Sequence, residues 1–167
     1  MSTPESRNLI RSAIITLVRA EGGEMVTRDL AAAGPETFTV TEPESLAAVR
    51  AAQRLAFAAE HAIRRYAHDA REDGHGWDEI GTALGCRPDP DRGITAAGAA
   101  FRLVAPDLGS GPCFGWTCPA CRKTVLDHGP EMGHPVDQER GHGEGCARLA
   151  EAVRAYDAQW EDGSDEH

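Results

Sequence analysis

Two short motifs near the C-terminal end constrain the fold of this 167-residue chain more than any other feature. Cys118-Pro-Ala-Cys121 predicts a tight turn that points two thiolates at one spot, and His142-Gly-Glu-Gly-Cys146 adds an imidazole and a third thiolate. Three sulfurs and one imidazole suit tetrahedral zinc. The twenty residues between the motifs leave room for a hairpin and a loop. We therefore expect a structural Zn²⁺ site formed by Cys118, Cys121, His142 and Cys146.

The fourth ligand has two alternatives. Residues four apart on a helix share a face, so His142 and Cys146 can meet one ion. His134 stands before a proline in a predicted loop and could replace His142, whereas Cys113, five residues ahead of the turn, would complete a four-sulfur site. A redox dithiol is the other interpretation of Cys-x2-Cys, but the strand-before, helix-after context of such a motif is missing.

Cysteine usage and charge limit the compartment and the partners. An odd number of cysteines, five, without an N-terminal signal pattern favours a cytoplasmic protein with metal ligands and free thiols. No apolar run reaches the length of a membrane span, so we expect no membrane partner. The net charge is −10, and residues 106–167 carry five positive and twelve negative side chains. Such a chain binds duplex DNA poorly unless it has a local basic face, because affinity depends on cationic contacts to phosphate.

The first part of the chain, residues 1–40, reads as an N-terminal helical segment. Apolar residues at helical spacing predict a helix over 7–21. A short helix capped near Thr27 is expected over 25–33, followed by a strand-like stretch at 37–40.

The strongest helical pattern covers 42–73, within a predicted domain over 41–105. Thr41 and Glu44 have the spacing of a capping box. Apolar residues then recur at spacings of three and four: Val49, Ala52, Ala56, Ala59, Ile63, Tyr66 and Ala70. This stripe predicts a long core helix, and a homodimer seam along the alanine-rich face is the alternative.

The stretch 76–85 predicts a short helix and a turn. Trp77, Ile80 and Leu84 share one apolar face. We expect Trp77, Ile80 and Leu84 to pack with Phe101 against Ile63 and Tyr66 of the long helix.

This stretch resembles the first helix and turn of bacterial helix–turn–helix domains, including the sigma-factor-like type. In those domains a small residue, here Gly81, admits the second helix closely, and a glycine after the leucine, here Gly85, permits the turn. The resemblance implies a DNA-reading helix over 94–103. The residues that would contact DNA are Arg87, Arg92, Thr95 and Arg102, with Arg64, Arg65 and Arg71 on the same basic face.

Two departures separate the chain from that pattern. Pro88 and Pro90 lengthen the turn, and residues 94–103 are mostly small and apolar, whereas a reading helix offers long polar side chains to the bases. Two functions therefore compete: a DNA-binding transcriptional regulator, and a zinc-stabilised protein-interaction module that does not bind DNA. Catalytic zinc, phosphate-loop and nucleophile-elbow motifs do not occur, so we expect no enzyme and no catalytic residues. A small zinc hydrolase with Glu144 as its base is the third alternative.

The C-terminal module is predicted over 112–160. We expect a hairpin over 114–127, a loop over 128–141 and a last helix over 143–160, which together make a ββα unit, followed by an acidic tail at 161–167. The predicted fold is thus mainly α, with a helix–turn–helix-like domain and a zinc-binding ββα module. The two halves together resemble small uncharacterised proteins of streptomycetes and related actinobacteria over most of 45–155, a resemblance that implies no activity.

Overall fold

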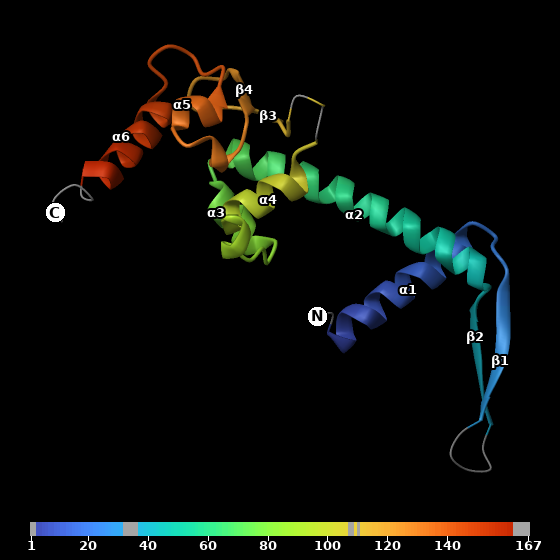
Figure 1. Cartoon of the computed structure of the whole chain (residues 1–167). Helices are drawn as coiled ribbons and strands as arrows, with labels where there is room; N and C mark the ends of the chain where they lie inside the picture. The colour runs from blue at the N-terminus through green and yellow to red at the C-terminus, as the bar shows by residue number, and fades with distance from the viewer. Residues whose placement is uncertain (1–2, 32–36, 107–108, 110, 162–167) are drawn as a thin grey trace. The chain divides into compact units, whose positions relative to one another are not determined.

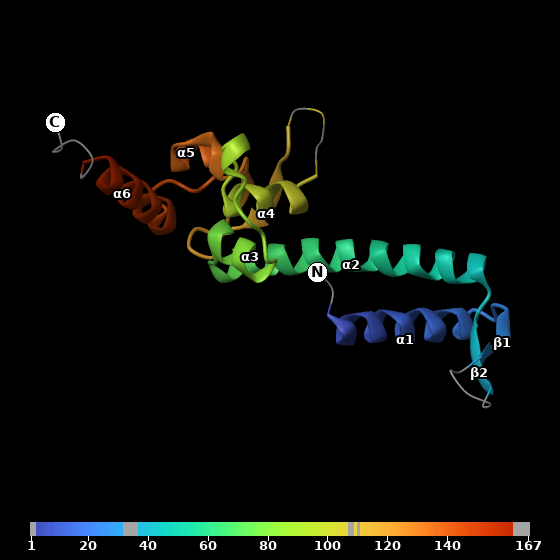
Figure 2. The ribbon, with the colours of Figure 1, turned by 60° about the horizontal axis from the view of Figure 1, so that its bottom comes forward.

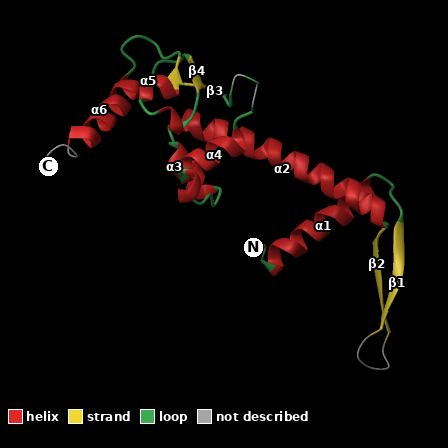
Figure 3. Cartoon of the chain, in the orientation of Figure 1, coloured by secondary structure: helices red, strands yellow, loops and turns green. Residues whose placement is uncertain are grey.

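A computed structural model describes residues 3–31, 37–106, 109 and 111–161, so most of the predicted acidic tail lies outside the described residues. The chain is mainly α-helical and has two small antiparallel sheets (Figure 1, Figure 3). It divides into two compact units, residues 1–62 and 63–167. Helix α2, Ser45–Asp73, begins in the first unit and ends in the second. Among the described helices, none combines the length and the apolar character that crossing a membrane requires.

The first unit contains helix α1, Pro4–Ala20, and a hairpin of β1, Met25–Ala31, and β2, Thr37–Pro43. The short helix expected over 25–33 is wrong, because residues 25–31 form β1 and pair antiparallel with β2, while 32 and 33 lie outside the described residues. Thr27 lies opposite Thr41, and their hydroxyls are 3.3 Å apart. β-Branched residues on both strands favour this ladder, and Thr27 serves it instead of capping a helix.

The start of α2 differs from the predicted capping box. Thr41 belongs to β2, so Glu44 takes the cap. The Glu44 carboxylate accepts hydrogen bonds from the N–H groups of Leu46 (2.8 Å) and Ala47 (3.0 Å). These bonds stabilise the carboxylate and lower the pKa of Glu44.

The predicted apolar stripe of α2 is only partly buried. Val49 and Tyr66 are 62% and 61% exposed, so neither belongs to a core. In the second unit the buried positions of α2 are Ala67 and Arg71, with Ile63 partly buried beside the core. The buried stripe is therefore narrower than predicted, and it includes a charged residue.

The core of the second unit forms where α3, Trp77–Ala83, and α4, Ala96–Val104, pack together (Figure 2). Trp77 meets Phe101 edge to face, with ring centroids 5.1 Å apart. A Cβ atom at Gly81 would lie 2.8 Å from the Ala96 carbonyl oxygen, so only glycine permits this close approach. The predicted packing of Trp77, Ile80 and Phe101 is confirmed, with Leu84 partly buried beside them.

A three-stranded antiparallel sheet of order β3-β4-β5 completes the second unit. The predicted hairpin is present as β3, Phe114–Thr117, and β4, Thr124–Asp127. The segment predicted as a loop, 128–141, contains more structure than expected. It holds a 3-10 turn, η2, at Pro130–Met132, a short α-helix, α5, at Pro135–Gln138, and strand β5 at Glu139–Arg140. The last helix, α6, spans Ala147–Glu161, and a 3-10 turn, η1, at Pro90–Arg92 lies between α3 and α4.

Candidate metal centre

The four predicted ligands lie together in the second unit. One ligand atom from each of Cys118, Cys121, His142 and Cys146 lies within 4.8 Å of all the others. Cys118 Sγ and Cys146 Sγ are 3.8 Å apart, and His142 Nδ1 is 3.7 Å from Cys121 Sγ and 3.4 Å from Cys146 Sγ. This cluster could hold a metal ion.

The first pair is held by the tight turn between β3 and β4. The N–H of Cys118 donates to the carbonyl of Lys123 (2.9 Å), and the N–H of Arg122 donates to the carbonyl of Cys118 (2.8 Å). Arg122 takes a left-handed conformation, with φ at 58°, which closes the turn. Both thiols therefore face the same point, as the Cys-x2-Cys spacing predicts.

The second pair is brought together differently from the prediction. His142 and Cys146 precede α6 and do not share one of its faces, since α6 begins at Ala147. A turn closes between them, in which the N–H of Cys146 donates to the carbonyl of Gly143 (3.1 Å) and Gly145 has φ at 68°. Glycines on both sides of Glu144 disfavour a helix and permit this turn. His142 and Cys146 therefore lie together as expected, but the predicted helix start at 143 is wrong.

Neither alternative ligand belongs to the cluster. His134 caps α5 by accepting a hydrogen bond from the N–H of Val136 at Nδ1 (3.2 Å), and its ring lies edge to face on Tyr156. Cys113 is a half-buried free thiol outside the four-residue group. Cys86 lies partly buried at the edge of the core.

The two thiols of the first pair have different electrostatic surroundings. Burial raises the pKa of Cys118. The N–H of Gly143, 3.3 Å from Cys121 Sγ, and then the imidazole of His142 lower the pKa of Cys121 to about 6. Because a metal binds the thiolate, the environment of Cys121 already favours the form that a metal needs.

A buried charged chain extends from the cluster to α2. His142 Nε2 lies 2.9 Å from Glu139 Oε2, and the other oxygen of Glu139 pairs with Arg71. Arg71 Nη2 also donates to Asp127 Oδ2 (2.9 Å). Arg71 and Asp127 are 2% and 1% exposed. A carboxylate on the far nitrogen of a ligating histidine fixes the ring orientation and the tautomer that binds metal.

Aromatic rings enclose the guanidinium of Arg71. It lies 4.7 Å from the ring centroid of Trp116 and 5.5 Å from that of Trp77, and Nη1 donates to the carbonyl of His75 (2.8 Å). Trp77 Nε1 donates to Asp127 as well (2.8 Å). Burial raises the pKa of Asp127, and the charge of Arg71 opposes that rise. The network thus joins α2, α3 and the small sheet.

Arg71 was expected on a basic surface, and that expectation is wrong. Arg71 is four residues from Ala67, so both lie on the buried stripe of α2. This spacing could have predicted from the sequence that Arg71 is buried.

Of the residues expected to contact DNA, two make contacts within the chain and two are exposed. The Thr95 hydroxyl caps α4 by accepting the N–H of Gly98 (3.0 Å), and Arg102 pairs with Glu131 (2.7 Å). Arg87 and Arg92 are exposed, and Arg92 lies 3.8 Å from Asp89.

The fold and the cluster define a mainly α-helical protein with a Cys₃His group beside a small antiparallel sheet. Comparison of the chain with protein-family models, with curated proteins and with solved structures finds no match.

Proposed function

We propose that this protein is a zinc-stabilised protein-interaction module whose metal ion is structural. At zinc distances of about 2.3 Å for sulfur and about 2.0 Å for nitrogen, tetrahedral geometry separates two thiolates by about 3.8 Å, and a thiolate from an imidazole by about 3.5 Å. The cluster has a sulfur–sulfur separation of 3.8 Å and sulfur–nitrogen separations of 3.7 and 3.4 Å. Four protein ligands leave no open position for a substrate, which favours a structural site over a catalytic one.

Zinc at this site would stabilise the fold of the C-terminal half. It would bind the deprotonated thiols of Cys118, Cys121 and Cys146 and the neutral imidazole of His142, so its binding free energy would add to the folding free energy. Glu144, the one local candidate for a catalytic base, is exposed.

The packing of α4 favours an interaction module over a DNA-binding regulator, and this observation carries the proposal. One side of α4 packs on α3, where a Cβ atom at Gly81 would lie 3.5 Å from Ala100 Cβ. The other side meets the segment that follows β4, since a Cβ atom at Gly98 would lie 2.6 Å from Glu131 Oε1. Arg102, the one cation of α4, pairs with Glu131. A recognition helix needs long polar side chains free to reach bases, whereas α4 has the character of a scaffold helix.

An exposed apolar stripe on α2 is the surface that we assign to a partner protein. Leu46, Val49 and Phe57 are 64%, 62% and 64% exposed. At 100° per residue these three positions fall on one side of the helix. Apolar residues gathered on a surface mark contact sites, and an amphipathic helix is the partner that such a stripe accommodates.

Two measurements test this function. We expect no binding of a random-sequence DNA duplex by fluorescence anisotropy even at low salt. A regulator would instead bind the duplex with an affinity that falls steeply as salt rises, and its binding would weaken when Arg87 and Arg92 are both replaced by Gln.

The second measurement uses an amphipathic-helix peptide selected from a random display library against the full-length, zinc-loaded protein. Phe57→Glu should abolish its binding, whereas Ala58→Glu, an exposed position on the same helix outside the stripe, should leave the affinity unchanged. Equal effects of the two substitutions would refute the assignment of the stripe.

A further inference from the structure

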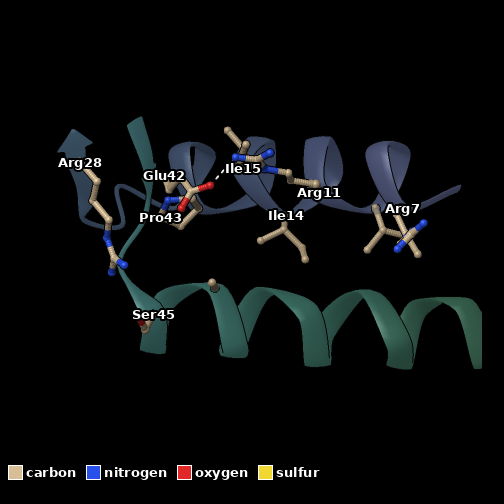
Figure 4. A pocket seen from close by; sticks show the side chains of 10 residues that line it. Arg7, Arg11, Ile14, Ile15, Arg28, Glu42, Pro43 and Ser45 are labelled. Atoms are coloured by element: carbon tan, nitrogen blue, oxygen red, sulfur yellow. Dashed lines mark hydrogen bonds and ion pairs between the residues drawn. The ribbon is translucent and has the colours of Figure 1, made fainter. Parts of the chain in front are cut away.

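A pocket of about 500 Å³ lies within the first unit, between α1, the hairpin and the first turns of α2 (Figure 4). This volume is within the range of small-molecule sites, roughly 300–1,000 Å³. Ile10, Ile14 and Ile15 of α1 line it, and Ala48 of α2 lies opposite them. Figure 4 shows Ile14 pointing from α1 into the space above α2.

Two ion pairs connect the elements around this space, and a small side chain faces it from α2. Arg11 of α1 pairs with Glu42 of β2, and Arg54 of α2 pairs with Glu21 at the C-terminal cap of α1. On the facing side of α2, the pocket is lined by the small side chain of Ala48. A residue as small as alanine opposite isoleucine leaves apolar surface without a packing partner, and that surface gains free energy when an apolar ligand covers it.

The charges around the pocket favour an anion. Three arginines and one carboxylate line it, and the carboxylate, Glu42, is paired with Arg11. Within the described part of the chain, Arg7 and Arg28 have no ion-pair partner. Figure 4 shows Arg28 and Ser45 at one end of the pocket and Arg7 at the other. This local positive charge is notable in a chain whose net charge is −10.

We propose that this pocket binds an anionic amphiphile with one hydrocarbon tail, of the fatty-carboxylate class. Arg28 would bind the carboxylate with two parallel N–H···O bonds, and the Ser45 hydroxyl would donate a further bond. The tail would run along Ile14 and Ile15 toward the Arg7 end. The site is independent of the metal cluster. It also differs from the apolar stripe of α2, because Ala48, which lines the pocket, lies about 100° or more around that helix from Leu46, Val49 and Phe57.

Isothermal titration calorimetry of the full-length, zinc-loaded protein with sodium decanoate tests the carboxylate. We expect one decanoate per chain and at least a tenfold weaker affinity for decanol, which has the same tail without the charge. Arg28→Gln should weaken decanoate binding at least tenfold. The matched control Arg19→Gln, exposed on α1 and outside the pocket lining, should leave it unchanged. Equal affinities for decanoate and decanol would overturn the proposal, as would equal effects of the two arginine substitutions.

A second pair of variants tests the cavity itself. Ala48→Leu fills the space without changing any charge and should abolish decanoate binding, while Ala59→Leu, exposed on the same helix, should not. If circular dichroism shows that the Ala48→Leu protein has lost helix, the Ala48→Val protein is tested instead. Binding that survives the filled cavity would place decanoate elsewhere and refute the site.

Two further results would also overturn the proposal. If decanoate does not bind, and Ala48→Leu converts a dimer into a monomer in sedimentation, a second copy of the chain occupies the space. If the protein co-sediments with anionic phospholipid vesicles but does not bind free decanoate, the arginines bind a membrane surface instead.

Discussion

Replacing Arg71 by Met removes the charge at the centre of the buried network while keeping most of the side-chain volume. In the folded protein Arg71 bonds Asp127 and Glu139 and lies against two tryptophan rings. After the substitution, Asp127 keeps the N–H groups of Trp77 and Gly129 but has no cation beside it, whereas Glu139 still has Arg148 at 3.9 Å. The variant therefore contains buried charge that is no longer compensated.

Removing one partner of a buried ion pair costs about 3–5 kcal/mol. This is a large part of the roughly 5–15 kcal/mol by which domains are stable. With a urea m-value of about 2 kcal/mol/M, a loss of about 4 kcal/mol lowers the unfolding midpoint by about 2 M. The matched control is Arg140→Met, which breaks an exposed pair with Asp137 and should cost less than about 0.5 kcal/mol.

The assay is urea unfolding followed by tryptophan fluorescence at a fixed free zinc concentration, since bound metal contributes to the apparent stability. A loss below about 1 kcal/mol, typical of surface substitutions, would refute the role of Arg71 as a buried bridge.

The loss of unfolding free energy in Arg71→Met should depend on pH, and this dependence supplies a second, independent criterion. Burial raises the pKa of Asp127, and Arg71 opposes that rise, so the pKa should climb further in the variant. An acid with a raised pKa in the folded state binds its proton more tightly there than in the unfolded state, and its contribution to stability falls as pH rises. The deficit of the variant relative to the parent should therefore shrink as pH falls from 7 to 5. A deficit that stays constant would mean that Asp127 is not the group left uncompensated.

Three other substitutions test separate parts of the structure. Glu139→Gln should weaken zinc affinity about 10–100-fold, because the carboxylate orients His142, while the exposed Glu144→Gln should not change it; competition with a chromogenic chelator measures both. Gly81→Ala should cost about 1–3 kcal/mol in urea unfolding, because the new methyl group has no room between α3 and α4, and a neutral result would show that the helices separate easily. The lowered pKa of Glu44 means that its cap contributes stability above its ordinary pKa and loses it as pH falls through the lowered value. Glu44→Gln should consequently lower the melting temperature at pH 7, and its effect should become smaller as the pH falls through the lowered pKa of Glu44.

The sequence predicts well the features that depend on local spacing. Cys118 and Cys121 are three residues apart and must meet in a tight turn, and the glycine-rich second motif supplies two more ligands at short range. Trp77 and Ile80 belong to one helical face, and Gly81 marks the close approach of α4. Each of these inferences uses residues within about one or two helical turns, where covalent geometry limits the alternatives.

The features that the sequence does not predict depend on distant partners. Arg71 is separated from Asp127 by 56 residues and from Glu139 by 68, and a charged residue on a helix is by default assigned to solvent. The segment 25–31 becomes a strand because β2 pairs with it, although its own composition also fits a short helix. In both cases tertiary pairing determines the outcome.

The buried network also connects α3 to the small sheet, because Trp77 of α3 donates to Asp127 of β4. Arg71 connects α2 to Glu139, and Glu139 contacts His142, so a metal ion bound by the cluster would be coupled to the packing of α2 on the small sheet. Helix α4 completes the same core through Phe101, against which a side chain at Gly129 would have no space. Arg102 and Leu103 lie on an exposed side of α4, while Ala97, Ala100, Phe101 and Val104 are buried in this core. The apolar stripe on α2 and the arginine-lined pocket beside α1 belong to the other unit, so the two surfaces that we propose for a partner and for a ligand both lie in residues 1–62.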